Sequence, residues 1–239
     1  MPLPSSPDPG HLRVLSYNIH KCVGLDRRRD PHRVAGVIRD IAPAIAVLQE
    51  VDRRLGSRPA ALPGDLVVQE CGLRPAPVAT TRVSLGWHGN AILLAPAWQM
   101  AELIRVPLPG LEPRGALIAD LDGPQPLRVV ATHLGLRRRD RQRQMTVIMA
   151  HLAAMSARPT ILLGDLNEWS VAAGFAPLDP YFTLHNPGRS FPARRPVAAL
   201  DRIATGPDLR LIASGTCRTG AAGRASDHLP IWGDIALAD

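Results

Sequence analysis

Carboxylate, amide and imidazole side chains recur in this sequence at the ends of short apolar runs. Asn18 follows the first run, Glu50 the second, His133 a later one, and Asp165 with Asn167 the next. Strand ends at one edge of a sheet bring side chains from distant parts of a chain together, and α/β folds commonly place their sites there. We therefore expect these residues to share one site.

Two further polar groups stand beside apolar runs near the C-terminus. Asp201 opens one such run, and Asp227 with His228 immediately precedes the last. A carboxylate beside an imidazole can orient the ring and favour its charged form. The sequence therefore predicts that Asp201 holds His228 as an oriented, charged histidine.

The oxygen-bearing members of this set suit a hard divalent cation. Mg²⁺ and Mn²⁺ prefer carboxylates, carbonyl oxygens and water, and Glu50, Asn18, Asp227 and Asp165 offer such oxygens. A metal, an oriented histidine and amide donors suit phosphoester hydrolysis, because its transition state spreads negative charge over equatorial oxygens. In that chemistry Asp165 would take a proton from water.

Eight short motifs follow one another over about residues 11 to 237. They are Ser-Tyr-Asn-Ile-His (16–20), Leu-Gln-Glu-Val-Asp (48–52), Gly-Asn-Ala-Ile-Leu (89–93), Arg114 with Ala116-Leu117, Thr-His-Leu (132–134), Gly-Asp-Leu-Asn (164–167), Leu-Asp-Arg-Ile (200–203) and Ser-Asp-His-Leu-Pro (226–230). The ordered set resembles the endonuclease/exonuclease/phosphatase superfamily of DNase I-like phosphoesterases. Each motif alone is weak, whereas eight in order make the resemblance highly specific.

The resemblance implies a fold and a metal site. The fold is α/β, a four-layer α/β/β/α sandwich of two mixed β-sheets flanked by helices, with a metal-dependent phosphoesterase site at one rim. In that site Glu50 with Asn18 would hold Mg²⁺ or Mn²⁺, and Asp227 would assist. Asp165 would orient or activate the attacking water.

The resemblance also implies which residues handle the phosphate. Asn167 and His133 would contact the scissile phosphate. His228, paired with Asp201, would stabilise the phosphorane or donate a proton. Arg114 would bind the phosphate or brace the site near it.

Two further candidates for phosphate binding have structural alternatives. Asn90 either contacts the substrate phosphate or forms a structural hydrogen bond beneath the site. Arg137, Arg138 and Arg139 begin three residues after the Thr-His-Leu motif, and we predict that they bind substrate phosphates. A run of this kind also suits the solvated start of a helix.

The elements that position these residues are predicted from hydrophobic patterns. Short apolar runs at 12–17, 44–48, 91–95, 127–131, 160–163 and 231–237 have lengths typical of strands. From residue 171 onward we expect mostly loop, with short strands near 200–204 and 209–213. Many short strands with helices in some connections indicate an α/β sandwich of mixed sheets.

Two amphipathic helices are predicted to cover the sheets. The first has apolar residues at 34, 37, 38 and 41, with Asp30 as its N-cap, Pro31 at its first position and Pro43 as its stop. The second carries the same spacing at 145, 148, 149 and 152, after Asp140.

Composition bounds the class of protein. The chain has 239 residues, 46% of them hydrophobic, and a formal net charge of +7 that favours polyanionic partners. We expect a flexible leader at 1–10 and one catalytic domain at 11–239. Three scattered cysteines and the lack of an apolar membrane-spanning or export segment predict a cytoplasmic protein, which we expect to be a monomer.

The sequence predicts the reaction more closely than the substrate. We expect a metal-dependent hydrolase of phosphodiester bonds that acts on nucleic acid, most simply a nuclease. The alternatives are a phospholipid- or sphingomyelin-type phosphodiesterase that meets a membrane lipid headgroup, an inositol-phosphate phosphatase, or an inactive scaffold that binds polyanions. A serine hydrolase is disfavoured because no G-x-S-x-G motif occurs.

Overall fold

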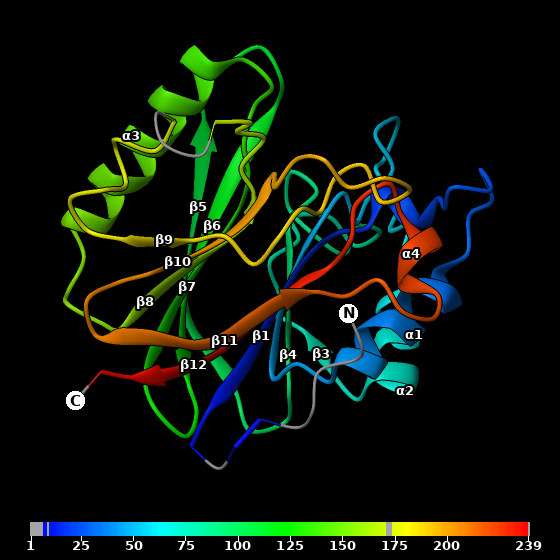
Figure 1. Ribbon diagram of the computed structural model, residues 1–239, viewed down its shortest axis with the longest axis horizontal. Coiled ribbons are helices and arrows are strands. Elements are labelled where there is room, and N and C mark those ends of the chain that lie inside the picture. Colours follow the sequence, from blue (N-terminus) through cyan, green and yellow to red (C-terminus); the bar gives the residue numbers. More distant parts are fainter. Residues whose placement is uncertain (1–6, 9, 171–173, 239) are drawn as a thin grey trace.

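The protein is described by a computed structural model that covers residues 7–8, 10–170 and 174–238 (Figure 1). In these ranges two β-sheets of six strands each face one another. The predicted leader at 1–10 lies mostly outside the described residues. The termini of the strands that carry the polar motifs meet at one rim of the two sheets.

The first sheet contains the N-terminal strand at its centre. Its strand order is β11-β12-β1-β2-β4-β3, and its members are β1 (Leu12–Asn18), β2 (Ile45–Gln49), β3 (Arg74–Pro75), β4 (Ala91–Leu94), β11 (Leu209–Thr216) and β12 (Ile231–Leu237). Strands β1 and β2 are parallel, whereas β12 and β4 run antiparallel to them on either side. The sheet is therefore mixed.

The second sheet repeats this plan with other strands. Its order is β5-β6-β7-β8-β10-β9, with β5 (Gln99–Leu108), β6 (Arg114–Asp122), β7 (Leu127–His133), β8 (Thr160–Asp165), β9 (Thr183–His185) and β10 (Asp201–Thr205). Strands β7 and β8 are parallel, and β6 and β10 are antiparallel to them. Both central parallel pairs thus end at the same rim.

Side-chain alternation along the strands builds the four layers. In β1, Val14 packs between the sheets against β6, β7 and β8, whereas Leu15 packs outward beneath helices α1 (Pro31–Ile41), α2 (Gly64–Cys71) and α4 (Ala222–Ala225). On the far face of the second sheet, α3 (Arg138–Ala153) covers residues such as Ile118 and Val130 (Figure 1). The predicted α/β/β/α sandwich is confirmed.

The first predicted helix is confirmed at both ends. The Asp30 carboxylate accepts a hydrogen bond from the Arg33 backbone N–H at 2.9 Å, and Pro31 occupies the first turn. Ala42 adopts a left-handed conformation (φ 53°) and ends the helix before Pro43. Asp30 stabilises the helix start because its side chain accepts a hydrogen bond from a backbone N–H that has no partner within the helix. Pro43 cannot continue the helix because it has no backbone N–H to donate.

Other boundaries differ from the sequence-based prediction. The second helix begins at Arg138, so Asp140 lies inside its first turn. Strands β5 and β6 and helix α2 were not predicted, because β5 is an exposed edge strand and β6 interrupts its apolar residues with Arg114, Gly115 and Asp120. In the described ranges, none of the helices has the length and apolar character needed to span a bilayer.

A buried ion pair joins β1 to β12, the strands that lead to Asn18 and away from His228. The Arg13 guanidinium donates to both oxygens of Asp234 at 2.8 Å, from directly opposite positions of the two strands. Both residues are buried. Each charge compensates the other, and removal of either side chain would leave the remaining one as an uncompensated buried charge.

We predict that Asp234→Asn lowers the free energy of unfolding by about 3 kcal/mol, because it leaves the Arg13 charge buried without its counter-ion. Urea denaturation measures the change. Asp40→Asn is the matched control, since Asp40 pairs with Arg39 at the surface and such pairs contribute under about 1 kcal/mol. Equal midpoints for the two variants would contradict the prediction.

Candidate active site

Strand register brings the predicted site residues to one rim. Asn18 ends β1 and Glu50 follows β2, while His133 and Asp165 are paired across the ends of β7 and β8. Asp201 lies opposite Asp165 at the start of the antiparallel β10. Residues more than a hundred positions apart in sequence are thus placed within hydrogen-bonding range.

The carboxylate of Asp165 is the centre of this cluster. Its Oδ2 atom accepts a hydrogen bond from Asn18 Nδ2 at 3.0 Å and lies 3.4 Å from His133 Nε2 and 3.6 Å from His228 Nε2. Its Oδ1 atom accepts from the Asn167 backbone N–H at 3.0 Å. Only 1% of the surface of Asp165 is exposed, so these donors replace the water molecules that would otherwise solvate its carboxylate.

A glycine permits the close approach of the two strands that carry this cluster. A Cβ atom at Gly164 would lie 2.0 Å from the Thr132 carbonyl oxygen, a backbone atom that cannot move aside. The residue before Asp165 must therefore lack a side chain. This requirement explains the glycine of the Gly-Asp-Leu-Asn motif.

His228 is held from behind by two residues. Its Nδ1 atom lies 2.9 Å from Asp201 Oδ2, and Ser190 donates its hydroxyl to the same oxygen at 2.5 Å. Burial lowers the pKa of His228, but the carboxylates of Asp201, Asp165 and Asp227 raise it more strongly, to about 10. The imidazole is therefore charged at neutral pH.

His133 has the opposite charge state although it faces the same carboxylate. Burial lowers the pKa of His133 to about 4, and the attraction of Asp165 opposes this only in part because Arg114 adds to the lowering. At neutral pH the site thus holds one neutral and one charged histidine. Such separation of pKa values is typical of groups with different roles in proton transfer.

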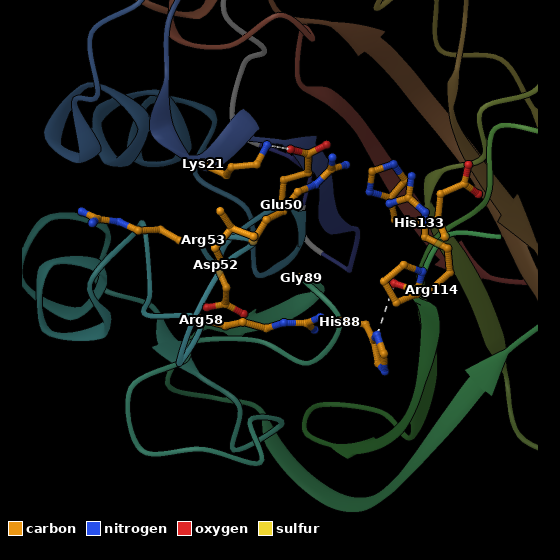
Figure 2. Close-up of a pocket in the computed structure, with 13 residues that line it drawn as sticks. Lys21, Glu50, Asp52, Arg53, Arg58, His88, Gly89, Arg114 and His133 are labelled. Carbon is orange, nitrogen blue, oxygen red and sulfur yellow. Dashed lines mark hydrogen bonds and ion pairs between the residues drawn. The ribbon is translucent and has the colours of Figure 1, made fainter. Parts of the chain in front are cut away.

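Glu50 lies beside the only lysine of the chain. Lys21 Nζ forms an ion pair with Glu50 Oε2, and the Lys21 backbone N–H donates to the Glu50 carbonyl oxygen at 3.0 Å (Figure 2). Burial acts to raise the pKa of Glu50, but His133 and Lys21 outweigh it and lower the pKa to about 2. Glu50 is therefore ionised, and its negative charge is stabilised by the positive charge of Lys21.

Asp227 borders the same end of β1. The hydroxyl of its neighbour Ser226 donates to the Asn18 carbonyl oxygen at 2.7 Å, which ties the loop to the strand. Asp227 Oδ1 lies 3.8 Å from His20 Nδ1, and the Asn18 Oδ1 atom accepts from the His20 backbone N–H at 3.1 Å. The loop therefore presents a partly exposed carboxylate next to Asn18.

The donors present at this rim fit a hard divalent cation. Glu50, Asp227 and the amide of Asn18 offer oxygen atoms of the kind that Mg²⁺ and Mn²⁺ prefer. Asp165, Asp201 and His228 also bring possible ligand atoms within 4.8 Å of one another. We regard this second group as less suited to a metal, because His228 is charged and already bound to Asp201.

The predicted phosphate ligands occupy three different environments. Arg114 begins β6 and is 8% exposed, and among the described residues its Nε atom has no hydrogen-bond partner. Asn90 is fully buried and donates to the Gly115 carbonyl oxygen at 3.0 Å, a contact that braces β6 beneath the site. Arg137, Arg138 and Arg139 are exposed at the start of α3.

The remaining predicted contact, Asn167, lies at the edge of the cluster. Its φ of 51° is left-handed, and its Nδ2 atom donates to the Leu134 carbonyl oxygen at 3.0 Å. The next residue, Glu168, forms a buried ion pair with Arg141 at 2.7 Å. Arg141 therefore anchors the Asn167 loop to α3 and is not available to a substrate.

An aromatic strip extends from the charged histidine to the surface. The Phe191 ring lies 4.8 Å from the His228 ring, and Trp169 meets Phe191 edge to face at 6.3 Å. Trp169 is 62% exposed. A planar group of a substrate could stack here beside the site.

Sequence reasoning missed two residues that shape the site. Lys21 and Ser190 act through Glu50 and Asp201 respectively. The only signal available for Lys21 was its place directly after the first motif and its status as the sole lysine. Nothing in the local pattern marked Ser190, because it lies in a loop region eleven residues before its partner Asp201, which begins β10.

The arrangement supplies the parts needed to cleave a phosphate ester. A buried carboxylate, one neutral and one charged imidazole, a second carboxylate, and the Arg114 guanidinium, whose Nε atom is unbonded among the described residues, converge on one rim. Cationic donors of this kind stabilise charge that develops on phosphoryl oxygens. A carboxylate such as Asp165 can accept the proton of an attacking water.

Comparisons with known proteins give matches over most of the chain. The "Uncharacterized protein YbhP" of Escherichia coli K12 is 32% identical over 167 residues, a match that covers 64% of this chain and 64% of that protein. The crystal structure of an endonuclease/exonuclease/phosphatase from Beutenbergia cavernae superposes with a TM-score of 0.71 at 23% identity, over 95% of this chain and 72% of that one.

A second similar structure contains nucleic acid. It is described as D. rerio TDP2 complexed with a single-strand DNA product, and it matches with a TM-score of 0.69 at 16% identity, over 94% of this chain and 98% of that one. The model of the Endonuclease/Exonuclease/phosphatase family matches residues 15–228. The chain therefore belongs to the endonuclease/exonuclease/phosphatase family.

Proposed function

We propose that the protein is a cytoplasmic, Mg²⁺- or Mn²⁺-dependent phosphodiesterase that acts on nucleic acid. The observation that carries the reaction is the meeting of Asp165 with the charged His228 and the unpaired Arg114 at one rim. Membership of a family of phosphoesterases supports the same reaction class. The three free cysteines favour a reducing compartment.

Glu50, Asn18 and Asp227 are the residues that would hold the metal ion. When bound, the ion supplies positive charge that stabilises the phosphoryl oxygens and the leaving oxygen. Glu50 remains ionised over the whole physiological range because its pKa is about 2. Asn18 also fixes Asp165 through its Nδ2 atom at 3.0 Å, so the proposed metal site and the proposed base share one side chain.

The proposed proton transfers use the two sides of the cluster. Asp165 accepts the proton of the attacking water, while the donors on its two oxygens fix its orientation. His228 carries a proton on Nε2 that it can donate to a phosphoryl or leaving oxygen, and Asp201 stabilises its positive charge. Neutral His133 and Asn167 contribute hydrogen bonds to the phosphate without adding charge.

Nucleic acid is the substrate class that the surroundings favour. Exposed Trp169 offers a stacking face next to His228, and aromatic stacking contributes about 1–3 kcal/mol per base in proteins that bind single strands. Exposed Arg137, Arg138 and Arg139 can contact backbone phosphates. A protein of similar fold is described with a single-strand DNA product.

A lipid phosphodiester is the second candidate, on a separate observation. Leu55, Leu111 and Leu136 are 86%, 67% and 64% exposed on loops near the strand ends of the site. Exposed leucines interleaved with arginines are typical of surfaces that lie on anionic membranes. Vesicle assays therefore belong in the functional test.

Our first functional prediction is metal-dependent turnover. With Mg²⁺ the protein should hydrolyse a chromogenic phosphodiester and single-stranded oligonucleotides faster than sphingomyelin or phosphoinositide vesicles, and EDTA should abolish activity. Glu50→Gln should raise the Mg²⁺ concentration for half-maximal activity at least tenfold, since it removes the ligand charge. Glu102→Gln on exposed β5 is the control, and an unchanged Mg²⁺ curve for Glu50→Gln would refute the metal assignment.

The proposed base and acid should act as one unit. Asp165→Asn and His228→Ala should each lower kcat by roughly 100- to 10,000-fold, the range of general acid–base catalysis. The double variant should lose far less than the product of the two losses, because both groups serve one transition state. His32→Ala at the exposed start of α1 is the control. Fully multiplicative losses would contradict a shared role.

The pH profile should report the charge of His228. Activity that requires the charged imidazole is present below its raised pKa of about 10 and is lost as pH rises through that value. Asp201→Asn removes a carboxylate that raises this pKa, so the basic limb of kcat against pH should move to lower pH. Ser190→Ala keeps the Asp201 charge and should move it less. An unmoved limb in Asp201→Asn would exclude His228 as the group observed.

A further inference from the structure

A pocket adjoins the site at Glu50, His133 and Arg114. Its volume is about 280 Å³, and its inner wall includes Glu50, His133 and Arg114 (Figure 2). The opposite wall is the loop at 53–58, together with His88. The pocket is therefore continuous with the cluster around Asp165, and a substrate held there could extend into it.

Cationic groups outnumber anionic groups in this pocket. Five arginine or lysine side chains and three carboxylates line it. Two of the carboxylates have partners: Glu50 pairs with Lys21, and Asp52 accepts hydrogen bonds from the backbone N–H groups of Leu85 and Gly86 at 2.8 and 3.2 Å. The third, Glu112, leaves a buried oxygen without a partner among the described residues.

Three arginines of the pocket, Arg54, Arg58 and Arg114, form no salt bridge with a carboxylate in the described ranges. Arg54 and Arg58 form no ion pair there, and Arg114 is more than nine-tenths buried with an unbonded Nε atom. Arg54 adds to the lowering of the Arg114 pKa that burial causes, and Arg58 does the same for His88. The carboxylates of Asp165, Glu50 and Glu112 attract Arg114, and that of Asp52 interacts with Arg58, but the arginine charges also act on neighbouring cationic groups. A bound anion would relieve that repulsion.

The directions of the side chains identify the groups that face the ligand. In Figure 2, Arg58 extends across the pocket toward His88 and Arg114 lies beside His133, whereas Arg53 points away. The Ser84 hydroxyl donates to the Arg58 carbonyl oxygen at 2.8 Å and tethers the loop at this residue. The guanidinium of Arg58 is thus the outer boundary of the pocket, and Arg114 joins the pocket to the catalytic cluster.

We propose that this pocket binds a second phosphate of the substrate, namely the phosphate next to the scissile one in a nucleic-acid strand. The inference rests on the proposed function, because the first phosphate must lie at the Asp165 cluster. Guanidinium groups suit the ligand since they bind phosphate oxygens through paired hydrogen bonds. Trp169, which reaches His228 through Phe191, would then receive a base of the same strand.

Two chromogenic esters with the same scissile bond test the proposal. They are the p-nitrophenyl ester of thymidine 5′-phosphate and the same ester carrying an additional 3′-phosphate. Wild-type protein should hydrolyse the doubly phosphorylated ester with a kcat/KM about tenfold higher or more, because hydrogen bonds to a charged phosphate are stronger than those between neutral groups. The double variant Arg54→Ala, Arg58→Ala should reduce this preference to near unity. Arg39→Ala, on the helix surface, should retain the wild-type preference.

Equilibrium binding separates this inference from catalysis. Calorimetry without metal should show that thymidine 3′,5′-bisphosphate binds more tightly than thymidine 5′-monophosphate, and that Arg58→Ala removes most of the difference. Equal affinities, or equal hydrolysis of the two esters by the wild type, would overturn the second-phosphate site while leaving a phosphodiesterase intact. Hydrolysis of neither ester nor any other phosphodiester with Mg²⁺ would instead overturn the proposed function.

A lipid substrate predicts a different result for the same variants. If the pocket served a phosphorylated headgroup, the Arg54→Ala, Arg58→Ala variant would lose activity on phosphatidylinositol phosphate vesicles, and the two nucleotide esters would be cleaved equally by the wild type. That outcome would overturn the assignment to nucleic acid. The assignment to nucleic acid would be supported if the Arg54→Ala, Arg58→Ala variant lost the preference for the doubly phosphorylated ester but kept its activity on vesicles.

Discussion

The burial of one carboxylate, Asp165, constrains the whole rim of the sandwich. A charge removed from water must be compensated by nearby donors, and four elements supply them: β1 through Asn18, β7 through His133, the loop after β8 through Asn167, and the loop before β12 through His228. The two sheets must therefore meet in one register at this edge. Gly164 serves the same requirement, because it lets β8 approach β7 at the position next to the carboxylate.

The surroundings of this charge also give the two histidines, His133 and His228, different protonation states. His133 is buried near Arg114 and remains neutral, whereas His228 is surrounded by carboxylates and remains charged. The Asp165 carboxylate thus faces one neutral and one charged histidine, although the two side chains are chemically identical. The difference comes from what lies behind each ring: Asp201 and Ser190 stand behind His228.

The elements were predictable wherever local periodicity was strong. The strands that contain Asn18, His133 and Asp165 are short apolar runs, and α1 carries its cap, its first-turn proline and its stop in the sequence itself. Strand β6 was missed although it is almost wholly buried, because Arg114 and Asp120 interrupt its apolar residues. The partner of Asp120, Arg128, faces it only in the folded protein. Edge strand β5 was missed for the opposite reason, since its exposed side chains leave no clear pattern.

The sequence alone determined the family, through eight motifs in order whose resemblance implied the four-layer sandwich and the residues of the rim. Local hydrophobic patterns placed most of the strands beside which those motifs stand. The tertiary structure alone decided how those residues are charged and which further groups support them. Lys21 beside Glu50, Ser190 beside Asp201, and the arginines gathered in the neighbouring pocket all depend on contacts between separate segments of the chain. Burial and Coulomb interactions set pKa values through such contacts, and a linear sequence does not contain the distances on which they depend.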